Sequence, residues 1–85
     1  EFVVCLPGAD GLRAASVAER MRRQIENMEI MLPDNSGSIR ITASFGTASI
    51  SVESGRNVDL LIKSADDALY RAKEKGRNRV WGDDK

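Results

Sequence analysis

The densest group of chemically active side chains lies near the C-terminal end of the chain. Five basic residues and one acidic residue gather between positions 71 and 79, namely Arg71, Lys73, Glu74, Lys75, Arg77 and Arg79. Basic groups at the end of a helix can grip a phosphate, and Arg does so through paired N–H donors. Such a run is also typical of a solvated helix end, because cations complement the helix dipole. The residues alone therefore leave open whether Lys73 and Arg77 bind a phosphate.

The carboxylates offer a second possible chemistry. Glu1 lies directly before an apolar run, and a carboxylate at the end of a strand can bind Mg²⁺ or accept a proton. A single acid at such a position is equally typical of an ordinary surface residue. Asp66 and Asp67 lie within a predicted helix, where the simplest interpretation is a polar surface. Cys5, within a predicted strand, is expected to be a small core hydrophobe.

Composition narrows the possible functions. The chain has 85 residues, which is the length of one small domain. It contains no His and one Cys, which excludes His-based catalysis and an internal disulfide, and favours an oxygen-ligated ion if a metal binds. Basic and acidic residues balance at 13 each, and only Tyr70 and Trp81 are aromatic near the basic run, so nucleic-acid binding is not expected. No apolar run could span a membrane, and no direct membrane contact is expected from this segment.

Hydrophobic spacing predicts the elements of the first half. The apolar residues 2–6 predict a buried strand, which Pro7-Gly8 ends. Asp10 predicts the N-cap of an amphipathic helix that ends near Asn27. Its predicted apolar side consists of Leu12, Ala15, Val17, Ala18, Met21, Ile25 and Met28, and Met31 is also expected to fill the core. Residues 33–38 predict a loop.

The second half predicts a strand, a helix and a short final strand. Alternation over residues 39–50 predicts a strand with one buried side, where Gly46 indicates a bulge or a close backbone approach. After a polar loop over residues 51–57, a helix is expected to start at Asn57 or Asp59. Its apolar stripe is Leu61, Ala65, Ala68, Leu69 and Ala72, beside a half-buried Tyr70, and Gly76 is the expected C′ residue. Residues 79–81 predict the last strand. This β-α-β-α-β order by itself favours a parallel sheet.

Five segments match, in order and spacing, the motifs of one known family. Residues 1–7 resemble the end of a Gly-Gly-Asp-Glu-Phe signature and its strand, and residues 18–22 resemble the helix that follows. Residues 41–48 resemble a Thr-x-Ser-x-Gly-x-Ala strand. Residues 65–73 and 76–78 resemble the closing Ala-Asp-x-Ala-Leu-Tyr-x-Ala-Lys and Gly-Arg-Asn motifs. The chain is identified as the C-terminal half of a GGDEF domain, the diguanylate cyclase family.

The resemblance implies a fold. A GGDEF domain is an α+β domain with a nucleotide-cyclase or palm-like mixed, largely antiparallel sheet flanked by helices. This chain would show the sheet as β-α-β-α-β without its first strand. Residues 1–82 are then the C-terminal part of one GGDEF domain, and residues 83–85 are a tail.

The resemblance also implies an activity. The family condenses two GTP into cyclic di-GMP with release of pyrophosphate, for bacterial second-messenger signalling. Two GGDEF domains meet in a homodimer, each presents one GTP, and Mg²⁺ or Mn²⁺ ions assist the reaction. An upstream sensory domain is expected. The location is expected to be cytoplasmic, either in a soluble protein or in the cytoplasmic part of a membrane-anchored sensor.

Four residues of this chain match functional positions of the family. Glu1 matches the fourth residue of the signature, a metal ligand and a candidate for activating the attacking 3′-hydroxyl. Lys73 and Arg77 match the positions that grip the triphosphate. Arg20 matches a basic position that helps bind product at an inhibitory site in some members.

The sequence as given departs from the family pattern at its start. It lacks the Gly-Gly-Asp of the signature, the first strand with its metal aspartate, the guanine-reading residues and the Arg-x-x-Asp product site. We therefore expect these 85 residues alone to be inactive. One alternative is a catalytically degenerate GGDEF module that binds GTP or cyclic di-GMP as a receptor or docking domain. Another is a small α+β interaction domain whose likeness to the family is coincidental.

Overall fold

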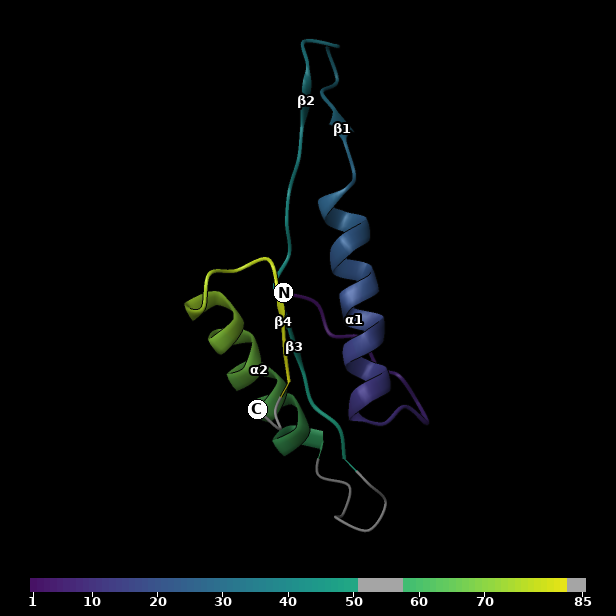
Figure 1. The fold of residues 1–85 in the computed structure, drawn as a ribbon, viewed down its shortest axis with the longest axis vertical. Coiled ribbons are helices and arrows are strands. Elements are labelled where there is room, and N and C mark those ends of the chain that lie inside the picture. Colours follow the sequence, from purple (N-terminus) through teal and green to yellow (C-terminus); the bar gives the residue numbers. More distant parts are fainter. Residues whose placement is uncertain (51–57, 83–85) are drawn as a thin grey trace.

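The computed structural model describes residues 1–50 and 58–82, and its elements follow one another in the order α1, β1, β2, β3, α2 and β4. The molecule measures 53 × 25 × 20 Å. Figure 1 shows α1 on one side of the β3–β4 pair and α2 on the other, with the β1–β2 hairpin extending beyond the end of α1. The predicted loop over residues 51–57, including Asn57 as a helix start, and the predicted tail over residues 83–85 lie outside the described residues.

Helix α1 spans Gly11–Glu26 and has the predicted caps. The Asp10 carboxylate accepts a hydrogen bond from the Arg13 N–H at 2.8 Å, which satisfies one of the backbone donors left open in the first turn. Asn27 ends the helix, and its N–H donates to the Arg23 carbonyl. Ala18 is buried as expected, whereas Leu12, which was assigned to the same apolar side, is 84% exposed.

A short hairpin follows α1 and was not predicted from the sequence. Strands β1 (Ile30–Met31) and β2 (Ser38–Ile39) pair antiparallel, with Ile30 opposite Ile39. The predicted loop connects them and is closed by the Leu32 N–H, which donates to the Gly37 carbonyl. Met28 and Met31 lie beyond the end of the helix and are largely exposed, so their assignment to the core is wrong. Their spacing continues that of the helix, but the helix ends at Glu26.

The core lies where α2 (Val58–Glu74) crosses the parallel pair β3 (Phe45–Thr47) and β4 (Val80–Gly82). Ala68 and Ala72 of α2 are buried, as the predicted stripe requires. The β3-α2-β4 unit is a crossover between parallel strands, and the order of elements alone favours that pairing. The domain therefore has one parallel strand pair, β3–β4, and one antiparallel pair, β1–β2, together with two helices. The predicted α+β class is confirmed.

Gly46 explains how α2 can lie so close to β3. A Cβ atom at Gly46 would collide with the Ala65 carbonyl oxygen and the Leu69 nitrogen of α2. The close backbone approach predicted at this glycine is therefore confirmed, and only a residue without a side chain fits there. The rest of the predicted strand is shorter than expected, because residues 40–44 form no strand and Ile41 is 45% exposed.

The predicted strand over residues 2–6 is wrong in this structure. These residues have no strand pairing, and Phe2 is 99% exposed. Cys5 is also exposed, which corrects its assignment to the core. The physical reason is that an apolar run becomes a strand only when a neighbouring strand satisfies its backbone groups, and no described strand pairs with it. Tyr70, expected to be half-buried, is 66% exposed.

The helices of the described part share one further property. Neither is both long enough and apolar enough to cross a membrane.

Candidate functional site

The candidate site is built around the connection between α2 and β4, here called the α2–β4 turn (residues 75–79). Helix α2 closes with two hydrogen bonds, in which the Gly76 N–H donates to the Lys73 carbonyl and the Arg77 N–H donates to the Ala72 carbonyl at 2.9 Å. This is the pattern of a glycine C′ cap, and Gly76 has the positive φ of 124° that the cap requires. The predicted role of Gly76 is confirmed.

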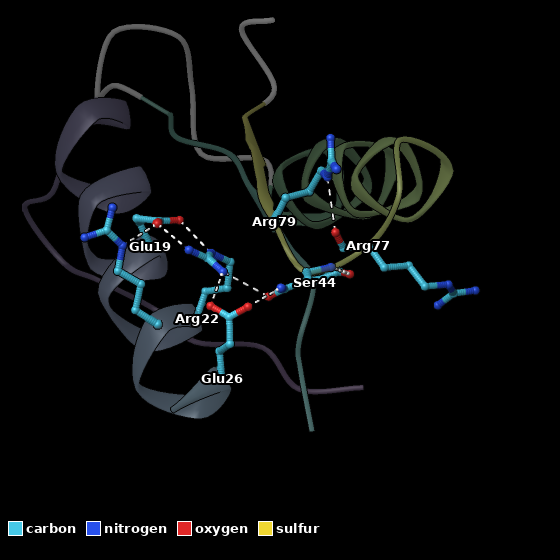
Figure 2. Close-up of polar contacts among 8 residues, drawn as sticks. Glu19, Arg22, Glu26, Ser44, Arg77 and Arg79 are labelled. Carbon is cyan, nitrogen blue, oxygen red and sulfur yellow. Dashed lines mark hydrogen bonds and ion pairs between the residues drawn. The ribbon is translucent and has the colours of Figure 1, made fainter. Parts of the chain in front are cut away.

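Asn78 ties the α2–β4 turn to the rest of the domain. Its side-chain oxygen accepts a hydrogen bond from Arg22 at 2.9 Å, and its side-chain nitrogen donates to Glu26 at 2.6 Å. Its backbone N–H donates to the Ser44 hydroxyl at 3.1 Å. Figure 2 shows these contacts converging on the turn from α1 and from the segment before β3.

Arg22 is the centre of a charged cluster on α1. Its guanidinium forms two parallel hydrogen bonds to Glu19, at 2.8 and 2.7 Å, and one to Glu26 at 3.2 Å. Its side chain is only 14% exposed. Arg23 also donates to Glu19 at 2.8 Å, so two basic and two acidic side chains balance within this cluster. Two parallel hydrogen bonds between an arginine and a carboxylate fix the orientation of the guanidinium and also neutralise its charge.

The hydrogen bonds in this cluster shift the ionisation of its members. Those from Arg22 and Arg23 lower the pKa of Glu19 to about 2. Those from Asn78 and Arg22 lower the pKa of Glu26. The bond to Glu19 raises the pKa of Arg22. All three groups are therefore charged near neutral pH, and the cluster is intact there.

Lys73 and Arg77, the predicted phosphate-binding residues, lie at the same end of α2. Lys73 is in the last turn of the helix and Arg77 follows the cap, and both are exposed. Neither side chain forms an ion pair within the described residues, and Figure 2 shows the Arg77 side chain extending away from Arg22 and Glu26. Two cations without a carboxylate partner at one end of a helix can receive an anionic ligand.

The other basic residues of this run differ in their surroundings. The Arg79 Nε donates to the Arg77 carbonyl at 3.1 Å, and a Cβ atom at Gly76 would lie 2.9 Å from its guanidinium. Arg79 therefore supports the turn. On the exposed side of α2, Lys63 pairs with Asp67 at 3.4 Å, which confirms the interpretation of Asp67 as part of a polar helix surface.

The other two predicted site residues, Glu1 and Arg20, form no hydrogen bond or ion pair with Lys73 or Arg77 in the described part of the chain. Glu1 is exposed, and within residues 1–50 and 58–82 no hydrogen bond or ion pair joins it to Lys73 or Arg77. Arg20 lies on the exposed side of α1, where it lines a surface hollow with Ser16 and Arg23. It forms no ion pair in the described part of the chain.

The described residues do not complete a metal site. They contain no group of three or more His, Cys, Asp or Glu side chains placed to hold an ion. Glu1 is a single exposed carboxylate, and one such group does not by itself hold the Mg²⁺ or Mn²⁺ ions that the resemblance implies.

The motif residues quoted from the sequence have structural roles in this geometry. Ser44, which lies just before β3, accepts a hydrogen bond from the Asn78 N–H, and Gly46 within β3 lies against the backbone of α2.

A family model described as diguanylate cyclase, GGDEF domain, matches residues 1–79. The chain belongs to the GGDEF domain family.

Several curated proteins of this family are similar to the chain. Diguanylate cyclase DgcM of Escherichia coli K12 is 44% identical over 80 residues. Diguanylate cyclase A of Treponema denticola is 34% identical over 80 residues, and response regulator PleD of Caulobacter vibrioides is 33% identical over 82 residues. The alignments cover 94–96% of this chain but only 18–21% of these relatives.

A solved structure confirms the fold assignment. The GGDEF domain of DgcB from Caulobacter crescentus, described in complex with c-di-GMP, superposes with a TM-score of 0.85 at 26% identity. The match covers 94% of this chain and 45% of that one. The GGDEF fold expected from the sequence motifs is therefore confirmed.

Sequence reasoning missed the cluster around Arg22. Glu19, Arg22 and Glu26 are not among the residues of the predicted apolar side, yet all three are partly buried. Arg22 and Glu26 also contact Asn78 in the α2–β4 turn. A signal was present in their spacing, because Glu19 and Glu26 flank Arg22 at three and four positions on one helix face. Their partner Asn78 is 56 residues from Arg22 and could not be found by local spacing.

Proposed function

We propose that this segment is part of a diguanylate cyclase that condenses two GTP into cyclic di-GMP and releases pyrophosphate. The observation that carries the proposal is the family match over residues 1–79 together with two cations at one end of α2, Lys73 and Arg77, which form no ion pair within the described residues. Relatives named diguanylate cyclase support it. Because the chain spans about a fifth of those relatives, the activity of the whole protein is part of the proposal.

Lys73 and Arg77 are proposed to bind the triphosphate. The reaction forms a new ester bond at the α-phosphorus of GTP and expels pyrophosphate, so negative charge grows on the leaving group. Cations placed beside the leaving phosphates stabilise that charge. Arg77 can do so with paired donors, and Lys73 as a point charge.

Glu1 is proposed to contribute a carboxylate, either as one ligand for Mg²⁺ or Mn²⁺ or in activating the attacking hydroxyl. Its exposure is compatible with both roles. Any further ligands of such an ion would come from residues other than the described ones. Arg20, exposed on α1, is proposed to contact the product at an inhibitory site.

The partners belong to the same proposal. The condensation joins two GTP molecules, so a second GGDEF domain that brings the second GTP is proposed as the partner in a homodimer. The name of PleD identifies that relative as a response regulator, which supports an upstream regulatory domain here.

The test is production of cyclic di-GMP by the full-length protein with GTP and Mg²⁺, measured by mass spectrometry. Glu1→Gln removes the carboxylate charge, and we expect it to reduce turnover by roughly 10²-fold or more. The matched control is Glu29→Gln, at an exposed position without a side-chain hydrogen bond or ion pair in the described residues, and it should leave turnover unchanged. Full activity of the Glu1 variant would refute the proposed role.

The same experiment separates the second candidate function. A protein that binds GTP or cyclic di-GMP with measurable affinity but forms no product would be a degenerate GGDEF module acting as a receptor. The DgcB structure with c-di-GMP is the observation that favours testing this alternative.

A further inference from the structure

The α2–β4 turn has a backbone that needs external support. Three consecutive residues have positive φ, namely Gly76 at 124°, Arg77 at 62° and Asn78 at 50°. Asn tolerates the left-handed region better than most residues do, but the side chain of Arg77 makes that region unfavourable. Such a conformation persists only when its surroundings fix it, and it occurs preferentially at functional sites.

The support comes from both sides of Arg77. On one side, the cap of α2 fixes its N–H against the Ala72 carbonyl at 2.9 Å. On the other side, Asn78 makes three hydrogen bonds, two through its amide group and one through its backbone. The amide uses its oxygen and its nitrogen at the same time, on Arg22 and Glu26, so its orientation is defined.

The supporting residues are themselves held in place. Arg22 is fixed by its two parallel hydrogen bonds to Glu19, and its side chain is mostly buried. The Arg77 side chain, in contrast, makes no ion pair within the described residues and extends away from this cluster (Figure 2). Because the backbone at Arg77 is already fixed, less conformational entropy is lost when its side chain binds an anion than would be lost from a flexible loop.

We propose that Asn78, Arg22 and Glu26 are positioning residues that orient Arg77 for a polyphosphate ligand. None of the three needs to touch the ligand, because they act through the backbone of the α2–β4 turn. The inference rests on the proposed function for the identity of the natural ligand as a nucleoside triphosphate. A nucleoside triphosphate and inorganic triphosphate share the polyphosphate group, so inorganic triphosphate can serve as the probe.

The first measurement is the dissociation constant of inorganic triphosphate for the full-length protein, by titration calorimetry. Asn78→Gly keeps a residue that tolerates positive φ but removes the amide, so the domain is expected to fold while the turn loses its tether. We expect triphosphate binding to weaken roughly tenfold, as is typical of coupled neighbours. Arg22→Lys keeps the positive charge but loses the paired donors of the guanidinium, and it should also weaken triphosphate binding.

A double-mutant cycle separates positioning from general stability. If Asn78 acts through Arg77, Asn78→Gly should change the affinity less than about twofold in a protein that already carries Arg77→Ala. In a protein that carries Lys75→Ala instead, the roughly tenfold effect should persist. An equal effect of Asn78→Gly in the presence and absence of Arg77 would overturn the inference.

The outcomes also distinguish this inference from the proposed function. Triphosphate binding with the expected non-additivity, but without cyclic di-GMP formation, would retain the positioning roles and refute the cyclase. Cyclic di-GMP formation with unchanged triphosphate affinity and unchanged KM for GTP in Asn78→Gly would refute the positioning roles alone. Failure of the unmodified protein to bind triphosphate would refute both.

Discussion

Two regions that carry predicted site residues differ in what holds them. The α2–β4 turn bears Arg77 and is tied to α1 and to the segment before β3 by the three hydrogen bonds of Asn78. The N-terminal segment (residues 1–10) bears Glu1 and leaves Phe2, Val3 and Val4 more than 60% exposed. Its one backbone hydrogen bond between residues of the segment closes a local turn, from the Ala9 N–H to the Leu6 carbonyl.

The difference shows that the local conformational preference of a segment does not decide whether the rest of the domain holds that segment in place. Residues 2–6 have strong strand propensity, yet they form no strand because no described strand pairs with them. Arg77 has an unfavourable backbone conformation, yet distant side chains support the turn through Asn78. The cationic part of the candidate site is therefore held by contacts within this chain, whereas Glu1 has no hydrogen bond or ion pair to any residue of the described ranges.

The largest expected difference concerns two glycines, one in β3 against α2 and the other in the N-terminal segment. Gly46→Ala would place a methyl group against the backbone of α2, and we expect it to lower the free energy of unfolding by about 3 kcal/mol or more. Gly8→Ala, in the N-terminal segment, meets no atom within 4 Å and costs only the strain of its positive φ, about 1–2 kcal/mol. Urea unfolding of the full-length protein measures both. Equal losses would show that the packing of α2 on β3 is looser than described.

A smaller difference is expected between two leucines. Leu69 belongs to the same predicted helix stripe as the buried Ala68 and Ala72. Leu69→Ala should destabilise the domain by about 2 kcal/mol, at the low end for buried leucines because Leu69 is partly exposed. Leu12→Ala, at the end of α1 next to the N-terminal segment, truncates a side chain that is 84% exposed, and it should change stability by less than about 0.5 kcal/mol. A larger loss at Leu12 than at Leu69 in thermal unfolding would contradict the assignment of the core.

The smallest expected effect is a dependence on pH. The folded structure lowers the pKa of Glu19 from 4.5 to about 2, so its contribution to stability is complete above pH 4.5 and disappears as the pH falls towards 2. The carboxylate is 37% exposed, so solvent screens the effect and we expect it to be modest. The difference in Tm between the unmodified protein and Glu19→Gln should be largest near neutral pH and shrink below pH 4.5. A difference that grows on acidification would contradict the cluster.

Much of the helical structure could be predicted from the sequence, because its signals are local. The cap at Asp10, the cap at Gly76 and the buried alanines of α2 each depend on residues within a few positions of one another. The family motifs also predicted the fold. The strands were less predictable, since residues 2–6 and 40–44 form none.

The candidate site was only partly predictable. The positions of Lys73 and Arg77 at one helix end follow from the motif, but their roles and that of Glu1 stay predictions. The cluster that supports the α2–β4 turn joins residues more than 50 positions apart, as in the contact between Glu26 and Asn78. A polar helix face gives no local sign that it will be buried against such a turn.

The most direct test of the central claim is the equilibrium dissociation constant of GTP for the full-length protein and two variants. The claim is that the α2–β4 turn presents Arg77 to a polyphosphate. Arg77→Ala should weaken GTP binding by roughly 10- to 100-fold, the loss expected for hydrogen bonds to a charged group. Lys75→Ala, in the same turn, should bind GTP as tightly as the unmodified protein. Unchanged affinity of Arg77→Ala would contradict the claim.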